Sequence, residues 1–350
     1  MSVTGGGDRG TDRMREPCFE NMIKVLGRER PERPVLYELF LNDTLYGKLA
    51  GPEVAGRTDK LARLGMIATA MRNAGYDYAP DSASAFAFPR GEFHSISTLS
   101  LNEGATITDK ETFRRYPWPD ANAFDYSKLS AIKPELPRGM KVIVLGPCGV
   151  LENAIQLVGF DRLCYMIADE PRLAGDIFDE IGSRLLEYYR SALKYDTVGA
   201  VVGNDDWGFK TQTMLSPRDM RRYVFPWHKR IVAAAHEAGR PAILHSCGNL
   251  REVMDDVIAD MGYDAKHSYE DTIQPVEEAY EEYGGRIAVM GGIDVDFLCR
   301  STPDEVTRRS LAMLERAGKR GGYALGTGNS VPEFIPEENY FAMTSAALAG

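Results

Sequence analysis

Apolar residues recur along this chain in two alternating patterns, and each pattern predicts one kind of element. Residues three and four positions apart are apolar over Leu61–Ala74, Pro171–Lys194 and Ser216–Ala238, which is the spacing of a helix with one buried face. Between such stretches lie short apolar runs, typical of strands that are buried on both faces. These runs begin at Val35, Tyr76, Lys141, Ala200, Ala242, Ala265, Ile287 and Tyr323.

This alternation of strands and helices predicts the α/β class. Strands separated by helices pair in parallel, and eight such units favour closure into a (β/α)8 TIM barrel. An open doubly wound sheet is the alternative, but no G-x-G-x-x-G follows the first predicted strand. We expect a single domain over residues 14–350, with an N-terminal helical extension at Glu16–Leu26 and an extended insertion or β-hairpin at Phe86–Asp109. Residues 1–13 have little to bury, so we expect a disordered tail there.

Two of the predicted helices have specific start signals. Ser216 followed by Pro217 is typical of an N-cap with proline in the first turn. The segment Thr302-Pro303-Asp304-Glu305 has the pattern of a capping box, in which a threonine and a glutamate each satisfy a backbone N–H. We also expect helices at Leu250–Met261 and Glu337–Leu348.

Composition and charge narrow the classes of function. The formal net charge of −10 argues against a general nucleic-acid or anionic-membrane surface, which would need clustered Lys and Arg. The five cysteines are odd in number and scattered, so no disulfide framework is expected. With no signal-peptide pattern and no apolar run of about 18 residues, we expect a cytoplasmic protein.

The segment around His245 and Cys247 has the clearest chemical pattern. Ala242–Leu244 is a short apolar strand that runs directly into both residues. Side chains two positions apart on an extended backbone point the same way, so the imidazole and the thiol are expected side by side. Zinc binds this pair of ligand types. The alternative is a buried cysteine beside a histidine whose hydrogen bonds are satisfied.

Polar side chains also follow most of the other predicted strands. In a TIM barrel the chemistry lies at the carboxyl ends of the strands, so these side chains are candidates for a shared site. They are Glu38, Asn42, Asp43, Asp77, Asp81, Asn204, Asp205, Asp206, His267, Glu270, Asp271, Asp294, Thr327 and Asn329. Buried in an apolar run, Glu38 must be paired, metal-bound or protonated. Asp205 and Asp206 could instead cap a turn, His267 could be structural, and Trp207 is expected to line a pocket wall.

Several short motifs occur in an order that resembles the uroporphyrinogen decarboxylase superfamily, and more closely its corrinoid-dependent methyltransferase branch. The motifs are Asn204-Asp205-Asp206-Trp207-Gly208, Leu215-Ser216-Pro217, Leu244-His245-Ser246-Cys247-Gly248-Asn249, Met290-Gly291-Gly292-Ile293-Asp294 and Gly326-Thr327-Gly328-Asn329-Ser330-Val331-Pro332. This resemblance covers about Met14 to the C-terminus. It implies a (β/α)8 barrel with one deep pocket at the carboxyl ends of the strands.

The resemblance also implies a zinc site. In the methyltransferase branch, the histidine and cysteine of H-x-C-G bind zinc with a second cysteine that falls on Thr327 here, and a hydroxyl is a poor zinc ligand. We therefore expect His245, Cys247 and Glu270 as ligands, with Glu38 as the second candidate for the carboxylate. The remaining site residues are assigned by role: Asp205, Asp206 and Asn329 to catalysis, and Glu38, Asn42, Trp207, His267 and Thr327 to substrate binding.

These features predict a zinc-dependent methyltransferase. It would move a methyl group between a small O- or N-methylated compound and a corrinoid protein, because no corrinoid-binding D-x-H-x-x-G occurs in this chain. A homodimer is implied by the family alone. One alternative is a metal-free lyase that decarboxylates a tetrapyrrole or a smaller acid, although Tyr37–Asp43 lacks the arginines that hold the carboxylates in the decarboxylases. A barrel that only binds a ligand is the other alternative.

Overall fold

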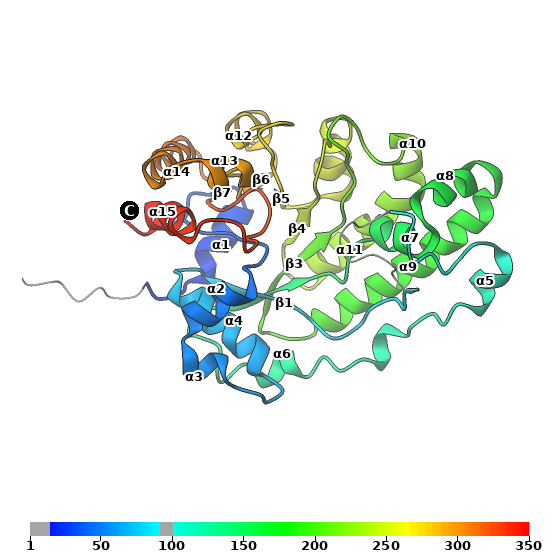
Figure 1. Ribbon diagram of the computed structural model, residues 1–350, viewed down its shortest axis with the longest axis horizontal. Helices are drawn as coiled ribbons and strands as arrows, with labels where there is room; N and C mark the ends of the chain where they lie inside the picture. Colours follow the sequence, from blue (N-terminus) through cyan, green and yellow to red (C-terminus); the bar gives the residue numbers. More distant parts are fainter. Residues whose placement is uncertain (1–14, 92–100, 350) are drawn as a thin grey trace, which may run out of the picture.

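The computed structural model describes residues 15–91 and 101–349. A parallel sheet lies at its centre, and its strands are ordered as they are in the sequence (Figure 1). The strands of the described residues are β1 (Tyr78–Ser82), β2 (Lys141–Leu145), β3 (Val198–Asn204), β4 (Ala242–His245), β5 (Ala265–His267), β6 (Ala288–Met290) and β7 (Tyr323–Ala324). The α/β class and the parallel pairing are therefore confirmed, as a half-barrel of seven strands.

The first predicted strand, at Val35–Phe40, is the one that does not form. This segment makes only a parallel bridge between Leu36 and Leu325, next to β7. On its β1 side, the backbone N–H of Glu38 donates to the side-chain hydroxyl of Tyr78 at 2.7 Å. A tyrosine side chain thus takes the place of the backbone hydrogen bonds that would join two strands. The hydrophobic pattern of a sequence does not indicate such a contact.

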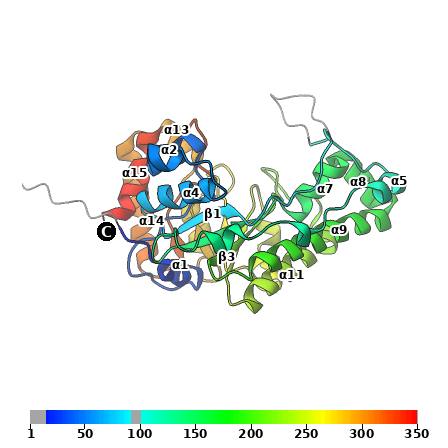
Figure 2. The same cartoon turned by 90° about the horizontal axis from the view of Figure 1, so that it is seen from below.

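Helices surround this sheet, and one group of them projects beyond it to one side. The α-helices of the described residues are α1 (Phe19–Leu26), α2 (Asp43–Ala50), α3 (Pro52–Ala55), α4 (Ala62–Asn73), α5 (Lys110–Arg115), α6 (Lys128–Ala131), α7 (Val150–Val158), α8 (Phe160–Asp169), α9 (Pro171–Ala192), α10 (Pro217–Asp219), α11 (Phe225–Glu237), α12 (Val276–Tyr283), α13 (Val295–Arg300), α14 (Pro303–Gly318) and α15 (Glu337–Leu348). Figure 2 shows α7, α8 and α9 projecting away from the group formed by α1, α2, α4 and α13–α15.

The predicted helix starts are present, but two helices contain wider turns. The hydroxyl of Ser216 accepts from the backbone N–H of Asp219, and the capping box at Thr302 forms as expected. The helix expected over Ser216–Ala238 is divided by a π-helical turn, η2 (Met220–Val224). The segment expected as the helix Leu250–Met261 is a 3-10 turn, η3 (Arg251–Val253), followed by a π-helical turn, η4 (Asp256–Met261).

The connection between β1 and β2 is long and mostly irregular. Beyond its short helices it contains the 3-10 turn η1 (Ala121–Ala123). The hairpin expected within Phe86–Asp109 falls partly on residues 92–100, outside the described residues, and its described flanks belong to no strand. This connection lies against α7–α9, where the backbone N–H of Phe160 donates to Leu101 at 2.9 Å and the Arg184 guanidinium donates to Pro119 at 2.9 Å. The tail expected at residues 1–13 is likewise outside the described residues.

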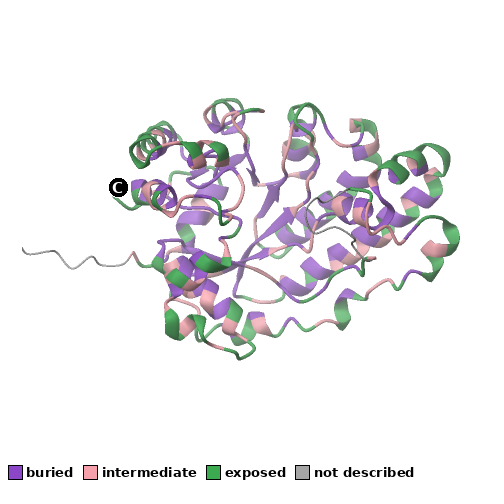
Figure 3. Ribbon diagram, in the orientation of Figure 1, coloured by how far each residue is buried: buried purple, intermediate pink, exposed green. Residues whose placement is uncertain are grey.

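The two ends of the described chain meet beside the sheet. A guanidinium nitrogen of Arg15 donates to the carbonyl of Ala347 at 3.4 Å, and the backbone N–H of Asn42 donates to Val331 at 2.9 Å. Figure 3 shows that the strands are buried on both faces. None of the helices in the described residues is long and apolar enough to cross a membrane.

Asp77 was expected at the carboxyl edge of the sheet but lies at the opposite, amino edge. Because β1 begins at Tyr78, Asp77 precedes the strand, and it accepts from the guanidinium of Arg33 at 2.6 Å. Asp81 does lie at the carboxyl end of β1, where it pairs with the ammonium of Lys128 at 2.7 Å. The expectation that Asp77 belongs to the functional edge is therefore wrong.

Candidate metal centre

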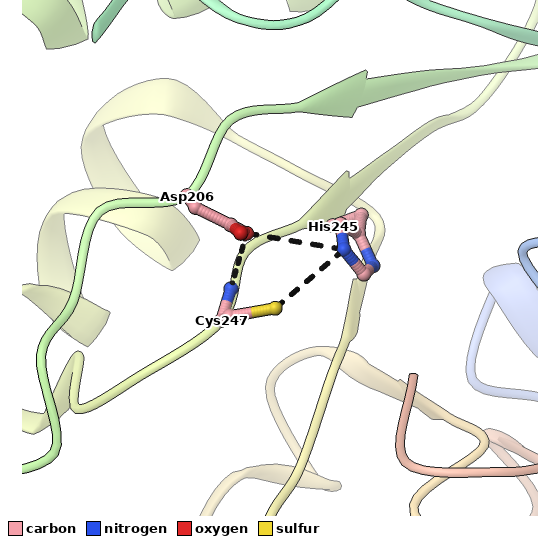
Figure 4. Close-up of side chains that lie close together, drawn as sticks. All are labelled: Asp206, His245 and Cys247. Carbon is pink, nitrogen blue, oxygen red and sulfur yellow. Dashed lines mark hydrogen bonds and ion pairs between the residues drawn. The ribbon is translucent and has the colours of Figure 1, made fainter. Parts of the chain in front are cut away.

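Three side chains from two neighbouring strands converge at the carboxyl edge of the sheet (Figure 4). His245 is the last residue of β4, Cys247 follows it by two positions, and Asp206 follows β3 by two positions. The His245 Nε2 atom lies 3.8 Å from the Cys247 sulfur and 3.9 Å from an Asp206 carboxylate oxygen. Among the described His, Cys, Asp and Glu residues, this is the group of three whose ligand atoms all lie within 4.8 Å of one another.

The parallel pairing of β3 and β4 explains this convergence. Asn204 pairs with His245 in the register of the two strands, so the residues that follow each strand emerge at the same edge. The backbone N–H of Cys247 donates to the Asp206 carboxylate at 2.8 Å, which joins the two segments beyond the strands. Gly248 has φ +84°, and a Cβ there would lie 2.1 Å from the carbonyl oxygen of Gly208. Only glycine fits this close approach of two backbones.

The imidazole of His245 is buried and is bonded on its inner side to a second imidazole. Its Nδ1 atom lies 2.8 Å from Nδ1 of His267, and the Nε2 atom of His267 lies 3.2 Å from the carbonyl oxygen of Thr327. Burial lowers the pKa of His245 to about 4 and the pKa of His267 well below its usual value. Both rings are therefore neutral near pH 7.

Two neutral donors surround the Cys247 sulfur. The side-chain amide of Asn329 donates to it at 3.2 Å and the hydroxyl of Ser268 at 3.4 Å. Burial, reinforced by the nearby Asp206 carboxylate, raises the pKa of the Cys247 thiol to about 12. Ser268 holds this position with φ +84°, a strained conformation of the kind that gathers at functional sites. A cation at this point would offset both the burial and the carboxylate charge.

The separations of the Cys247 sulfur and the Asp206 oxygen from His245 Nε2 are close to those around a zinc ion. Tetrahedral zinc with bonds of about 2.0–2.3 Å separates its nitrogen, oxygen and sulfur ligands by about 3.4–3.6 Å. The observed separations of 3.8 and 3.9 Å from His245 Nε2 exceed this by only a few tenths of an ångström. The Asp206 side chain is 39% exposed, whereas that of His245 is 8% exposed, so solvent reaches the group from the Asp206 side. Three protein ligands and an accessible fourth position are typical of catalytic zinc.

Asp205, the neighbour of Asp206, has a different set of partners. Its two carboxylate oxygens accept from the backbone N–H groups of Leu151 and Glu152, each at 2.9 Å, at the start of α7. One of these oxygens also lies 2.9 Å from Nε2 of His228, and Asp205 is completely buried. The structure therefore separates the two aspartates that the sequence assigned jointly to catalysis.

Glu38 and Thr327, both expected at the substrate, bind each other instead. The Thr327 hydroxyl donates to one carboxylate oxygen of Glu38 at 2.6 Å, and the Thr327 backbone N–H donates to the other at 2.7 Å. Both residues are completely buried, and burial raises the pKa of Glu38 to about 8. The Thr327 hydroxyl is thus engaged by Glu38, and the Thr327 carbonyl oxygen lies 3.2 Å from Nε2 of His267.

The other predicted site residues occupy three different surroundings. Asn42 caps α2 by accepting from the backbone N–H of Leu45. Trp207 is completely buried and packs edge-on against His228. Glu270 and Asn329 line a cavity of about 1040 Å³ at the carboxyl ends of β5–β7, and Asp206, His245 and Cys247 are not among its lining residues. Asn329 is therefore shared between this cavity and the Cys247 sulfur.

Sequence reasoning missed two groups next to this site. Ser268 was unassigned, although it directly follows His267 at a strand end. Glu152 was unassigned as well, and burial, with the charges of Asp205 and Asp206, raises its pKa to about 8. No motif marks either residue. The usable signal for Ser268 was its position next to a predicted strand end.

TIM-barrel enzymes carry their functional groups at the carboxyl edge of a parallel, barrel-like sheet. This chain has the same arrangement, with potential metal ligands at that edge. The family model described as "Uroporphyrinogen decarboxylase (URO-D)" matches residues 106–349, and the chain belongs to this family. The resemblance inferred from the motifs is confirmed.

Curated relatives and solved structures agree with this family. The chain is 27% identical over 207 residues to uroporphyrinogen decarboxylase of Anaeromyxobacter sp. (strain Fw109-5), covering 58% of this chain and 56% of the relative. It is 27% identical over 249 residues to the enzyme of the same name from Myxococcus xanthus (strain DK1622), covering 64% and 68%. The chain thus spans little more than half the length of the first of these relatives.

The fold is shared with a solved methyltransferase from Methanosarcina mazei. The two chains superpose with a TM-score of 0.68 at 16% identity, and the match covers 96% of this chain and 99% of the other. At this identity the likeness establishes the fold alone.

Proposed function

We propose that this chain is a zinc-dependent methyltransferase that moves a methyl group between a small O- or N-methylated compound and a corrinoid bound to a partner protein. The observation that carries the proposal is the convergence of His245 Nε2, the Cys247 sulfur and the Asp206 carboxylate, together with Asn329, which donates to this sulfur and lines a cavity. An imidazole, a thiolate and a carboxylate are all zinc ligands.

The proposed ligand set differs in one member from the set expected from the sequence. Asp206 would replace Glu270 as the carboxylate ligand, because its oxygen lies within 4.8 Å of both other ligand atoms. Glu270 lines the cavity instead, where it would face the substrate. Thr327 does not act as a ligand in this proposal, since its hydroxyl donates to Glu38.

Breaking a methyl C–O or C–N bond leaves the bonding electron pair on the heteroatom. The methyl carbon forms its new bond with the electron pair of Co(I), and the alkoxide or amide anion that leaves is a poor leaving group until its negative charge is stabilised. Bound zinc would supply Lewis acidity at the heteroatom. The chain's own residues would place the substrate: Asn329 reaches both the cavity and the sulfur, and the half-buried Glu270 carboxylate would orient a polar or cationic group. Asp205 would act indirectly, by holding the start of α7.

The substrate would occupy the 1040 Å³ cavity. Its wall combines apolar side chains, among them Val295, Phe297 and Phe334, with the carboxylates of Glu270 and Asp294. Such a mixed wall suits a small methylated molecule with one polar group. The corrinoid partner is inferred from the resemblance of the motifs to corrinoid-dependent enzymes, and the fold shared with a methyltransferase is consistent with it.

Decarboxylation is the second candidate function, favoured by the names of the curated relatives. A polycarboxylate substrate would need a basic clamp, because desolvated carboxylates cost several kcal/mol without a partner. The cavity is lined by four carboxylates and one guanidinium, which is no cluster of basic residues for such a substrate: Glu270, Asp271, Asp294, Asp296 and Arg300. This argument places methyl transfer ahead of decarboxylation.

Metal content and turnover separate the two candidates. We expect about one zinc per chain after purification without added metal, loss of that zinc in Cys247→Ser, and weaker zinc binding in Asp206→Asn. Cys164→Ser is the matched control, because Cys164 is exposed on α8. Methyl transfer from O- and N-methylated compounds to a Co(I) corrinoid protein should require the zinc. A chain that binds no zinc and decarboxylates uroporphyrinogen would contradict the proposal.

A further inference from the structure

A continuous line of buried hydrogen bonds runs from the metal group into the protein interior. It begins at Nδ1 of His245, which lies 2.8 Å from Nδ1 of His267. It continues from Nε2 of His267 to the Thr327 carbonyl at 3.2 Å. It ends at Glu38, which accepts from both the backbone N–H and the hydroxyl of Thr327. His267, Thr327 and Glu38 are buried, so water does not compete for these bonds.

The directions of the two hydrogen bonds made by His267 follow from the Thr327 carbonyl. A backbone carbonyl only accepts, so Nε2 of His267 must carry the proton. In a neutral imidazole the other nitrogen then has a lone pair, and Nδ1 of His267 must accept from Nδ1–H of His245. Nε2 of His245 is left with a lone pair, directed at the Cys247 sulfur and the Asp206 carboxylate.

The other arrangements place like groups against each other. If Nδ1 of His267 carried the proton, its Nε2 lone pair would face the oxygen lone pairs of Thr327. If both Nδ1 atoms carried a proton, two N–H groups would face each other across the 2.8 Å Nδ1–Nδ1 contact. The low pKa values that burial gives both rings agree with two neutral rings.

The anchoring carbonyl has little freedom to move. A Cβ at Gly326 would lie 1.7 Å from the carbonyl oxygen of Tyr37, and a Cβ at Gly328 would lie 2.2 Å from that of Tyr269. The peptides on both sides of Thr327 are therefore packed directly against neighbouring backbone. The ring of Tyr37 also packs edge-on against His267, with centroids 4.9 Å apart.

We propose that His267 is a positioning residue that, held by the Thr327 carbonyl and through it by Glu38, fixes His245 in the tautomer whose Nε2 is unprotonated and ready to bind a metal ion. Histidine ligands are commonly oriented in this way through their second nitrogen. The metal part of this inference rests on the proposed function, whereas the tautomer itself does not. It also assigns a use to the Thr327 hydroxyl, which holds the loop that carries the acceptor.

The tautomer can be read directly in the metal-free protein. The sequence contains only five histidines, so selective ¹⁵N labelling and long-range ¹H–¹⁵N correlation resolve each ring. Assignment uses the variants His228→Gln, His236→Gln, His245→Gln and His267→Gln, and the remaining ring is that of His94. We expect His245 protonated at Nδ1 and unprotonated at Nε2, and His267 protonated at Nε2. A His245 ring protonated at Nε2 in the wild-type protein would overturn the inference.

Variants at His267 test the positioning role separately from folding. In His267→Gln the amide oxygen can accept from His245 while the NH₂ group donates to Thr327, so the tautomer and Co(II) affinity should stay close to wild type. In His267→Phe the acceptor is lost, and Co(II) affinity, measured by competition with a chromophoric chelator, should fall about 10- to 100-fold. His236→Gln, at an exposed histidine, is the control.

The outcomes distinguish this inference from the proposed function. Unchanged Co(II) affinity in a folded His267→Phe protein would overturn the positioning role while leaving the metal site intact. If His267→Phe does not fold, His267→Leu removes the same acceptor with a different apolar side chain and should likewise allow His245 to populate both tautomers. A wild-type protein with the expected tautomer but no affinity for Zn(II) or Co(II) would contradict the proposed function and leave the tautomer assignment standing.

Discussion

Two consecutive aspartates, each beside a histidine, have opposite surroundings in this molecule. Asp205 touches His228 at 2.9 Å, and the pair is almost completely buried. The second ring nitrogen of His228 lies 2.7 Å from the Tyr263 hydroxyl, so both ends of the pair are satisfied. Asp206 lies 3.9 Å from His245, beyond hydrogen-bond distance, and its side chain is 39% exposed.

This difference separates a structural pair from a potential ligand pair. Successive side chains leave an extended segment on opposite sides, so one residue step takes the carboxylate from the α7 side to the open edge of the sheet. Every acceptor of Asp205 is occupied by protein donors. Asp206 and His245 converge without bonding to each other, which leaves room for a cation between them.

Removing the structural aspartate should have the largest effect. Asp205→Ala would leave two N–H groups of α7 and Nε2 of His228 without a partner at a completely buried position. We expect the free energy of unfolding to fall by about 3–5 kcal/mol, measured by urea denaturation of metal-free protein. Asp206→Asn keeps the oxygen that accepts from Cys247 and should change stability by less than about 1 kcal/mol. Equal losses in the two variants would remove the distinction between the aspartates.

Most of the fold could be predicted from hydrophobic spacing, because long amphipathic segments determine their own structure. The helix expected at Glu337–Leu348 has those bounds, and Pro171–Lys194 is α9 with its last residues unwound. The strand at Val35–Phe40 was wrong because its pairing depends on the hydroxyl of Tyr78, a contact between distant residues. The π-helical turn η2 ends two residues before Pro226, which has no backbone N–H to donate within a helix, so this break had a signal in the local sequence.

The candidate site was only partly predictable. His245 and Cys247 are two residues apart, so alternation alone places them together. The grouping with Asp206 depends on the register of β3 against β4, which a single sequence does not encode locally. The bond between Glu38 and Thr327 joins residues 289 positions apart, and each looked like a separate candidate. Their shared role could not be anticipated without the closure of the sheet near β7.

The close approach of the two loops gives the second prediction. Gly248→Ala would place a Cβ 2.1 Å from the carbonyl oxygen of Gly208, which must move together with the segment that carries Asp206. We expect a loss of about 1–3 kcal/mol beyond the cost of the positive φ angle. Gly239→Ala is the matched control, because Gly239 has φ +67° and its Cβ would meet nothing within 4 Å. Equal unfolding free energies for the two variants would show that the loops are not held together here.

Metal affinity should distinguish the Asp206–His245 pair from the Asp205–His228 pair. Asp206→Asn removes the ligand charge but keeps the shape of the side chain, so zinc affinity should fall about 10- to 100-fold, a change typical of altered metal surroundings. The conservative variant Asp205→Asn should change zinc affinity much less, because Asp205 bonds to α7 and His228. Competition with a chromophoric chelator measures both. A larger loss of affinity in Asp205→Asn than in Asp206→Asn would show that Asp206 is not the carboxylate ligand.

The smallest expected effect concerns the Cys247 sulfur, which lies next to the Asp206–His245 pair. Asn329 donates to the Cys247 sulfur at 3.2 Å and also lines the cavity. Asn329→Ala removes one donor to the thiolate, which is worth about 1 kcal/mol, so zinc affinity should fall about fivefold. Ser330→Ala is the neighbouring control, because Ser330 lines the same cavity and is half-buried like Asn329. Since Ser268 also donates to the sulfur, Asn329→Ala should keep the stoichiometry of zinc while weakening its binding. Complete loss of zinc in Asn329→Ala would instead make Asn329 indispensable to the site.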